Sequence, residues 1–213
     1  MCQCAFCPNP ESGLSYYEDD YLKMIEPYKV AGTLKYFPEL LAEMVAYIEE
    51  NRDSSQGNDL LGEFFQQELS RGRSGQFFTP FHICQMMAEI TRAEETKPST
   101  VLDPCCGSGR MLLAFGKNAK MPHCYYGVDI DPVCTKMAAI NLFLNGLQGE
   151  VICADALLPD DFRLGYRISF QPLGIFKVER KEDSMVWQIN QNSFLKNGKN
   201  ESEKILQGQL QLF

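Results

Sequence analysis

Apolar residues recur along the chain with spacings that predict where helices form. A spacing of three and four residues predicts a helix after Pro38, whose core-facing side would carry Leu41, Met44, Val45 and Ile48. After a polar break at 53–57, a second helix is predicted, with an apolar side made of Leu60, Leu61, Phe64, Phe65 and Leu69. Residues 1 to about 36 show neither pattern, so we expect them to be irregular.

Two further helices carry recognisable start signals. Thr79 precedes Pro80, which predicts an N-cap followed by proline at the first helical position. The apolar residues behind it are Ile83, Met86, Met87 and Ile90. Asp131 and Pro132 repeat this arrangement, and Gly146 predicts the end of that helix.

Short β-branched runs alternate with these helices at 100–103, 125–130 and 151–154. Strands and helices that alternate at these lengths predict a parallel α/β sheet with right-handed crossovers. Ligands of such sheets bind beyond the carboxyl ends of the strands. Asp103, Asp129 and Asp155 all fall at that position, so we expect them to mark a binding site.

The segment after the first strand has glycines at Gly107 and Gly109 and then a helix-compatible run at 111–115. Glycine permits a close approach of the backbone to a ligand, and a helix N-terminus presents free N–H groups. Asp129 ends the next strand about twenty residues on, where an acidic side chain grips ribose hydroxyls in dinucleotide-binding folds.

Four stretches in order extend this pattern to a known family. The segment Asp103–Gly109 resembles the first motif of S-adenosylmethionine-dependent methyltransferases, in a form typical of adenine-N6 DNA methyltransferases and especially of the modification subunits of type I restriction systems. The stretches Gly75–Pro80, Gly127–Pro132 and Val151–Leu157 resemble the neighbouring motifs. The resemblance covers roughly residues 58 to 160.

This resemblance implies a Rossmann-like methyltransferase sheet that is abbreviated after the fourth strand. Residues 1–74 would form an N-terminal irregular and helical segment, 75–190 the cofactor-binding domain and 191–213 a flexible tail. The implied S-adenosylmethionine contacts come from the segment before the glycine turn, the turn itself and two strand ends: Gln76, Phe77, Phe78, Thr79, Pro80; Cys105, Gly107, Ser108, Gly109 with Asp103; Asp129 and Ile130; Asp155 and Ala156.

The catalytic motif of the family is degenerate in this chain. The family has Asn or Asp, two prolines and an aromatic residue, which position a flipped adenine. The only comparable stretch has Gln171 and Pro172 followed by Leu173 and Gly174. Two functions stay open: adenine-N6 methyl transfer on DNA with a separate recognition subunit, or an inactive cofactor-binding module that regulates or scaffolds a DNA-modification or replication complex.

The rest of the domain is short for this family. Phe170, Gly174–Val178 and Met185–Ile189 could supply three strands, the last two as a hairpin over 179–183, with Trp187 serving for packing. Residues 190–207 are rich in Asn, Lys, Glu, Ser and Gly, which predicts a flexible linker.

Charge and cysteine content narrow the function classes. A net charge of −8 argues against a nucleic-acid-binding surface over the whole protein, although a local basic patch remains possible at Arg71, Arg73, Lys177, Arg180 and Lys181. The nine cysteines are scattered over predicted strands, loop and helix, which indicates reduced thiols in a cytoplasmic protein. Cys2, Cys4 and Cys7 offer half of a zinc ligand set without a second pair, so no metal site is expected.

The last five residues carry a separate signal. Gln209–Phe213 resembles the short peptide that binds the bacterial sliding clamp, with Gln209, Leu210, Leu212 and Phe213 at the matching positions. The alternative is that these residues fold back on the domain as a last strand or helical turn.

Overall fold

The computed structural model describes residues 18–51, 59–70, 78–92, 97–158 and 160–188 of the 213. Several predicted features fall outside these ranges: Gln76, Phe77, the three N-terminal cysteines and the C-terminal pentapeptide. In the part of the chain that is described, no helix has the length and apolar character that crossing a membrane requires.

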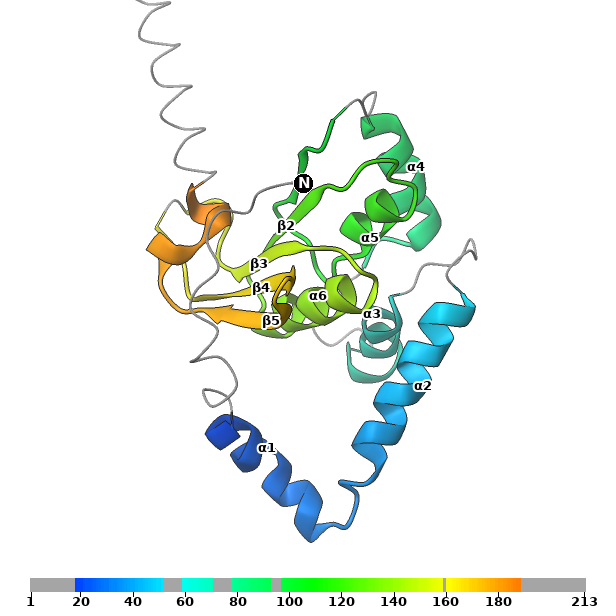
Figure 1. Ribbon diagram of the computed structural model, residues 1–213, viewed down its shortest axis with the longest axis vertical. Helices are drawn as coiled ribbons and strands as arrows, with labels where there is room; N and C mark the ends of the chain where they lie inside the picture. The colour runs from blue at the N-terminus through cyan, green and yellow to red at the C-terminus, as the bar shows by residue number, and fades with distance from the viewer. Residues whose placement is uncertain (1–17, 52–58, 71–77, 93–96, 159, 189–213) are drawn as a thin grey trace, which may run out of the picture.

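A five-stranded mixed sheet forms the centre of the domain (Figure 1). The strands β1 (Thr100–Asp103), β2 (Cys124–Asp129) and β3 (Gly149–Cys153) are parallel, as the alternation of strands and helices predicts. The strands β4 (Leu164–Phe170) and β5 (Leu173–Val178) continue the sheet antiparallel to β3. The order is β1-β2-β3-β4-β5, so β1 is the edge strand on one side and β5 on the other.

The hairpin does not lie where the sequence predicts it. It joins β4 to β5 at Gln171 and Pro172, and residues 185–188 form a helical turn instead of a strand. The Ser184 hydroxyl accepts a hydrogen bond from the Trp187 amide at 3.2 Å, which caps this turn. Val186 and Trp187 are buried, so the expected packing role of Trp187 holds in a different element.

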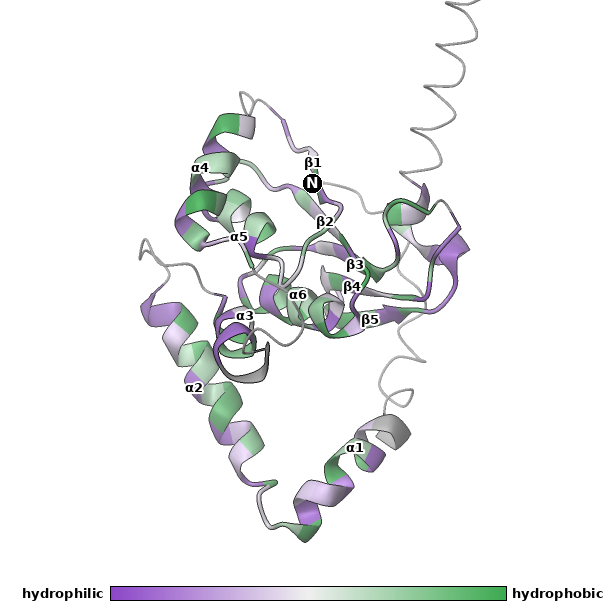
Figure 2. Ribbon diagram, turned by 180° about the vertical axis from the view of Figure 1, so that it is seen from behind, coloured by the Kyte–Doolittle hydropathy of each residue, from purple (hydrophilic) through white to green (hydrophobic). Residues whose placement is uncertain are grey.

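Helices α5 (Arg110–Lys117) and α6 (Pro132–Leu144) cover one face of the sheet, and α4 (Phe81–Thr91) packs on α5. The core on this face combines Leu112 and Leu142 with residues of β2 and β3. The predicted start of α6 is confirmed, because the Asp131 carboxylate accepts a hydrogen bond from the Val133 amide at 2.7 Å. Figure 2 shows apolar residues along the inner helices.

The start of α4 differs from the prediction. The helix begins at Phe81 with Pro80 as its N-cap, and no side chain caps it. The Pro80 carbonyl accepts hydrogen bonds from the amides of Ile83 and Cys84, which places Thr79 one residue too early for capping. Thr79 therefore lies outside the helix, and its carbonyl is available to other donors.

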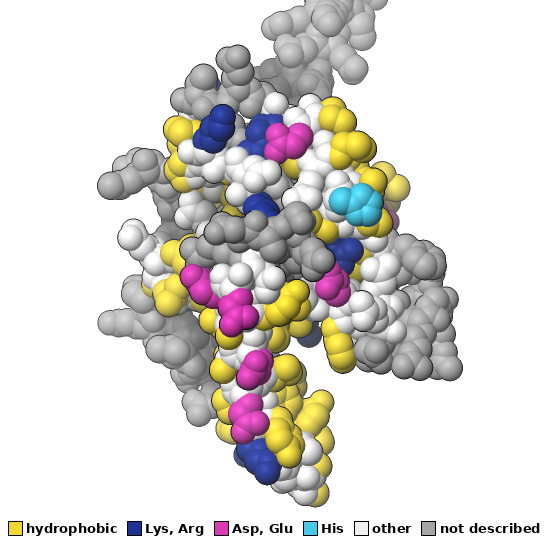
Figure 3. Space-filling view, turned by 90° about the vertical axis from the view of Figure 1, so that its right-hand side faces the viewer, with side chains coloured by type: hydrophobic (Ala, Val, Ile, Leu, Met, Phe, Trp, Pro, Cys, Tyr) yellow, Lys and Arg dark blue, Asp and Glu magenta, His cyan; other side chains and the backbone are white. Residues whose placement is uncertain are grey.

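The N-terminal part is more helical than predicted and less buried. Helix α1 (Glu18–Val30) occupies a region expected to be irregular, and α2 (Tyr36–Glu50) follows it. Both extend away from the sheet (Figure 1). Of the predicted apolar side of α2, Ile48 is buried, but Leu41 and Val45 are about half exposed, at 54% and 48%. Figure 3 shows acidic side chains on this projecting part beside apolar ones.

The chain returns to the domain through α3 (Leu60–Phe64) and a π-helical turn at Phe65–Ser70. Asp59 is the N-cap of α3, since its carboxylate accepts a hydrogen bond from the Gly62 amide at 2.9 Å. Asp59 is only 1% exposed, so this cap lies inside the domain against the helices that cover the sheet.

Candidate functional site

The carboxyl ends of the three parallel strands lie at one edge of the sheet. The register pairs Asp103 with Gly127 and Asp129 with Cys153, and Asp155 follows β3 by two residues. The structure therefore brings the three predicted acidic positions to the same edge. In parallel α/β sheets this edge is where ligands bind.

The glycine turn between β1 and α5 is held against the end of β2. The Gly107 amide donates a hydrogen bond to Asp129 Oδ2 at 2.7 Å, and the Cys106 amide donates to the Val128 carbonyl at 2.9 Å. Gly107 and Gly109 have φ of 55° and 86°, which an L side chain rarely adopts. The turn thus needs glycine at both positions, as its sequence indicates.

An aromatic ring closes the other side of the turn. A Cβ placed on Gly107 would lie 3.1 Å from the Phe78 ring, which in turn stacks on Phe65 at a centroid distance of 6.0 Å. The turn is therefore enclosed between Phe78 and β2. The segment before α4 therefore contacts the glycine turn, although 25 or more residues separate the two in the sequence.

The Asp129 carboxylate is oriented by backbone amides on both oxygens. Besides the bond from Gly107, Oδ1 accepts a hydrogen bond from the Asp131 amide at 2.9 Å. A carboxylate has about four acceptor positions, so two remain for ligand hydroxyls. Ile130, the adjacent predicted residue, is 55% exposed and places an apolar side chain next to this carboxylate.

The loop after β3 is braced by a second set of polar contacts. The Asp155 amide donates to Asp161 at 2.6 Å, while the Asp155 carboxylate accepts from the Leu157 amide at 2.9 Å. Arg163 bonds both Asp161 and the Ile130 carbonyl, which ties this loop to the end of β2. The Ala156 side chain is exposed at the same edge.

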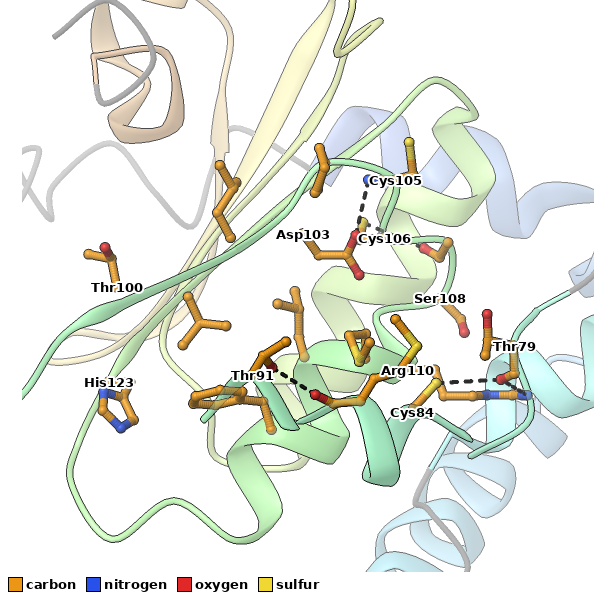
Figure 4. Close-up of a pocket in the computed structure, with 18 of the residues that line it drawn as sticks. Thr79, Cys84, Thr91, Thr100, Asp103, Cys105, Cys106, Ser108, Arg110 and His123 are labelled. Carbon is orange, nitrogen blue, oxygen red and sulfur yellow. Dashed lines mark hydrogen bonds between the residues drawn. The ribbon is translucent and has the colours of Figure 1, made fainter. Parts of the chain in front are cut away.

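A cavity of about 810 Å³ opens beside the glycine turn and runs along the free edge of β1 (Figure 4). Six of the predicted cofactor residues line it: Phe78, Thr79, Asp103, Cys105, Gly107 and Ser108. Asp129, Ile130, Asp155 and Ala156 lie outside its lining, at the adjacent strand ends. The candidate site consists of this cavity together with the neighbouring carboxyl ends of β2 and β3.

The Asp103 carboxyl lies in surroundings that disfavour its negative charge. Burial raises the pKa of Asp103 above its ordinary value, and the nearby negative charge of Asp129 adds to this effect, although the Cys105 amide, which donates to Asp103 at 3.1 Å, opposes it. A cationic group beside Asp103 would stabilise the ionised form of this carboxyl.

The buried thiols near the turn are unsuited to nucleophilic chemistry. Burial raises the pKa of Cys106 well above its ordinary value and that of Cys134 to about 12. Thiols of this kind stay protonated at neutral pH, and the thiolate is the reactive form. Cys106 is buried against Gly127 of β2, whereas Cys105 is exposed.

Sequence reasoning missed a buried polar cluster under the glycine turn. Asp59 accepts hydrogen bonds from Ser108 Oγ at 2.5 Å, from Arg110 Nε at 2.8 Å and from Asn141 Nδ2 at 2.6 Å. All four residues are at most 7% exposed. Asp59 directly before an apolar helical run was a readable N-cap signal. Its partners, however, lie 49 to 82 residues away, beyond any local pattern.

The predicted catalytic pair lies away from this site. Gln171 and Pro172 form the β4–β5 turn, and β2 and β3 separate that hairpin from β1. Because β4 is antiparallel to β3, with Ile168 opposite Gly149, the turn lies at the amino end of the parallel strands. The candidate site is at their carboxyl end, so the structure does not bring the two together.

Fold and site together define an α/β protein with a candidate ligand site between a glycine turn and strand-end carboxylates. The sequence profile of the family described as N-6 DNA Methylase matches residues 57–204. This range spans more than half of the chain and includes every element of the candidate site. The chain therefore belongs to the N-6 DNA methylase family.

Three relatives illustrate the relationship. The MjaVII methylase subunit of a type I restriction enzyme from Methanocaldococcus jannaschii is 28% identical over 144 residues, which cover 62% of this chain and 24% of that protein. The MpnII methylase subunit from Mycoplasma pneumoniae is 28% identical, with 65% and 28% covered. The type II restriction enzyme and methyltransferase RM.BcgI from Heyndrickxia coagulans is 30% identical, with 64% and 24% covered. The chain spans about a quarter of the length of these relatives.

Proposed function

We propose that the chain is the S-adenosylmethionine-binding unit of an adenine-N6 DNA methyltransferase, with the groups that hold the target base supplied by another polypeptide. The observation that carries the proposal is the bond between Gly107 and Asp129, which joins the two family motifs into one ligand-binding edge. The names of the relatives, methylase subunits of restriction enzymes, support DNA as the substrate class.

The residues present suit this cofactor. The oriented Asp129 carboxylate has acceptor positions for two ribose hydroxyls, and exposed Ile130 and Ala156 beside Asp155 offer an apolar surface and polar groups for an adenine ring. The cavity next to them has room for an amino-acid chain, and Asp103 in its lining complements a cationic sulfonium or ammonium group. Loops that bind a nucleoside triphosphate typically carry Gly-Lys-Ser or Gly-Lys-Thr, and this turn has no lysine.

When bound, S-adenosylmethionine supplies an activated methyl group. The chain's own residues then have three tasks: Asp129 orients the ribose, Asp103 compensates positive charge and Phe78 closes the glycine turn against water. None of these groups accepts a hydrogen bond from the target amine. Gln171 and Pro172 lie at the opposite end of the strands, which supports the supply of that acceptor by a partner.

The same position of Gln171 favours a second candidate, a cofactor-loaded module that regulates or scaffolds a DNA-modification or replication complex. Both candidates require the cofactor, whereas only the first requires methyl transfer. The distinction therefore depends on activity measured with and without a partner that carries an intact catalytic motif.

Titration calorimetry with S-adenosylmethionine tests the cofactor. We expect micromolar binding to the intact chain and a loss of about tenfold or more for Asp129→Ala, which removes charged hydrogen bonds. An Asp183→Asn variant, which changes an exposed carboxylate that pairs with Arg180 outside the site, is the matched control. Absence of binding at high micromolar ligand contradicts the proposal.

Sequencing of DNA from a methylation-free host tests the chemistry. Expression of the chain alone should give no N6-methyladenine. Co-expression with a methylase subunit whose catalytic motif is intact and whose cofactor motif is inactivated should give N6-methyladenine. Methylation by the chain alone would show that it is a complete enzyme. No methylation in any combination, with intact cofactor binding, would favour the regulatory module.

A further inference from the structure

Arg110 holds one buried hydrogen-bond donor that no described residue satisfies. Its Nε donates to Asp59 at 2.8 Å, and its Nη1 donates to the Thr79 carbonyl at 3.1 Å. Its Nη2 is buried and has no hydrogen-bond partner among the described residues. Buried donors are nearly always paired, so an unpaired one requires an explanation.

The guanidinium cannot turn toward Asp59 to satisfy this donor. Each carboxylate oxygen of Asp59 already accepts two hydrogen bonds: Oδ1 from the Gly62 amide and Asn141, and Oδ2 from Ser108 and Arg110 Nε. The Phe78 ring lies 5.8 Å from the guanidinium carbon and limits its movement on another side. These contacts therefore hold Arg110 in one orientation, in which Nη2 has no hydrogen-bond acceptor among the described residues.

Arg110 is one of the residues that line the cavity beside the glycine turn. Arg110 lines it together with Thr79, Ser108 and Asp103, and its side chain runs toward Thr79 (Figure 4). The charged residues in the lining are Arg110, Asp103 and Lys97. A cavity with a fixed cation and a carboxylate complements the two charges of an α-amino acid, whose carboxylate and ammonium are joined through one carbon.

We infer that Arg110 Nη2 is the donor that binds the carboxylate of the methionine part of S-adenosylmethionine. The inference rests on the proposed cofactor and adds a specificity-determining residue to its site. Arginine suits this role because its planar group recognises carboxylates directionally. The bond between Nε and Asp59 fixes that plane before the ligand arrives, which reduces the ordering cost of binding.

The test compares two ligands that differ only by this carboxylate, S-adenosylmethionine and decarboxylated S-adenosylmethionine. Calorimetry on the intact chain should give an affinity about tenfold or more higher for the carboxylate-bearing ligand. The variant Arg110→Gln should lose that preference and bind both ligands with the affinity of wild type for the decarboxylated one. Lys97→Gln, which removes the other cation of the cavity, should keep the preference.

Each outcome decides the matter. Equal affinity of wild type for the two ligands overturns the role of Arg110 and leaves the cofactor proposal intact, and this comparison needs no substitution that could harm folding. A parallel loss for both ligands in Arg110→Gln, or a lost preference in Lys97→Gln, also overturns it. Absence of binding of either ligand to wild type overturns the cofactor proposal and this inference together.

Discussion

The Gly107 amide and the Asp129 carboxylate are joined by a hydrogen bond of 2.7 Å, although 22 residues separate them. This bond makes the glycine turn and the end of β2 one rigid edge. Asp129 thus has a structural task in addition to the ligand contact proposed for it. Changes at either residue should affect both stability and cofactor affinity.

Replacing Gly107 by alanine should be more damaging than the same change at another left-handed glycine. Gly146→Ala is the control, because φ is 74° and nothing lies within 4 Å of an added Cβ. A left-handed backbone alone costs about 1–2 kcal/mol for an L residue. At Gly107 the added methyl also meets Phe78 at 3.1 Å, so urea unfolding should show a larger loss and calorimetry a weaker cofactor affinity. Equal effects of the two variants would contradict this account.

The buried ion pair of Asp59 and Arg110 should contribute far more than an exposed pair. Asp59→Ala leaves the guanidinium buried without its partner, and the free energy of unfolding should fall by about 3–5 kcal/mol. Asp183→Ala breaks an exposed pair with Arg180 and should cost about 0–1 kcal/mol. Chemical denaturation of both variants measures the difference. Losses of similar size would show that the cluster is not a stabilising centre.

Asp103 should make stability depend on pH. Because its pKa is raised in the folded state, the fold favours the protonated form, and the resulting stability is present below the ordinary value of 3.8. It is lost as pH rises through the raised pKa. The free energy of unfolding of Asp103→Asn relative to wild type should therefore increase as the pH rises above 3.8. If the free energies of unfolding of the two proteins differ by the same amount at every pH measured, Asp103 is not the source of the pH dependence.

The C-terminal pentapeptide should bind the bacterial sliding clamp. Each large apolar side chain that is buried contributes about 1.5–3 kcal/mol, and after the cost of ordering a peptide, micromolar affinity is expected. A fluorescence titration with clamp should therefore give binding by the intact chain and none by a chain that lacks Leu212 and Phe213. Equal binding by the two would favour the alternative, in which the pentapeptide folds back on the domain.

Much of the site was visible in the sequence because its determinants are local. A glycine turn after a β-branched strand needs only its own backbone conformation, and Asp131 with Pro132 starts α6 through contacts two residues away. The carboxyl ends of parallel strands share an edge by geometry, so Asp103, Asp129 and Asp155 could be grouped without coordinates.

Two predictions were wrong because contacts with distant parts of the chain, and not local sequence preference, determine the structure at those positions. The residues at 185–188 have the apolar character of a strand, but Ser184 caps a helical turn there and Val186 packs in a core cluster with residues of β2 and β3. The spacing of apolar residues correctly predicts the helix α2. It does not determine whether another element packs on the apolar side, which is partly exposed.

The sequence by itself determined the parallel strands, the glycine turn and the acidic strand ends, because each follows from residues within a few positions of one another. Only the tertiary structure decided that Gln171 and Pro172 lie at the opposite end of the sheet, since an antiparallel return reverses the direction of the chain. It alone also placed Asp59 beneath the glycine turn, where its carboxylate accepts hydrogen bonds from Ser108, Arg110 and Asn141 because burial leaves it no water.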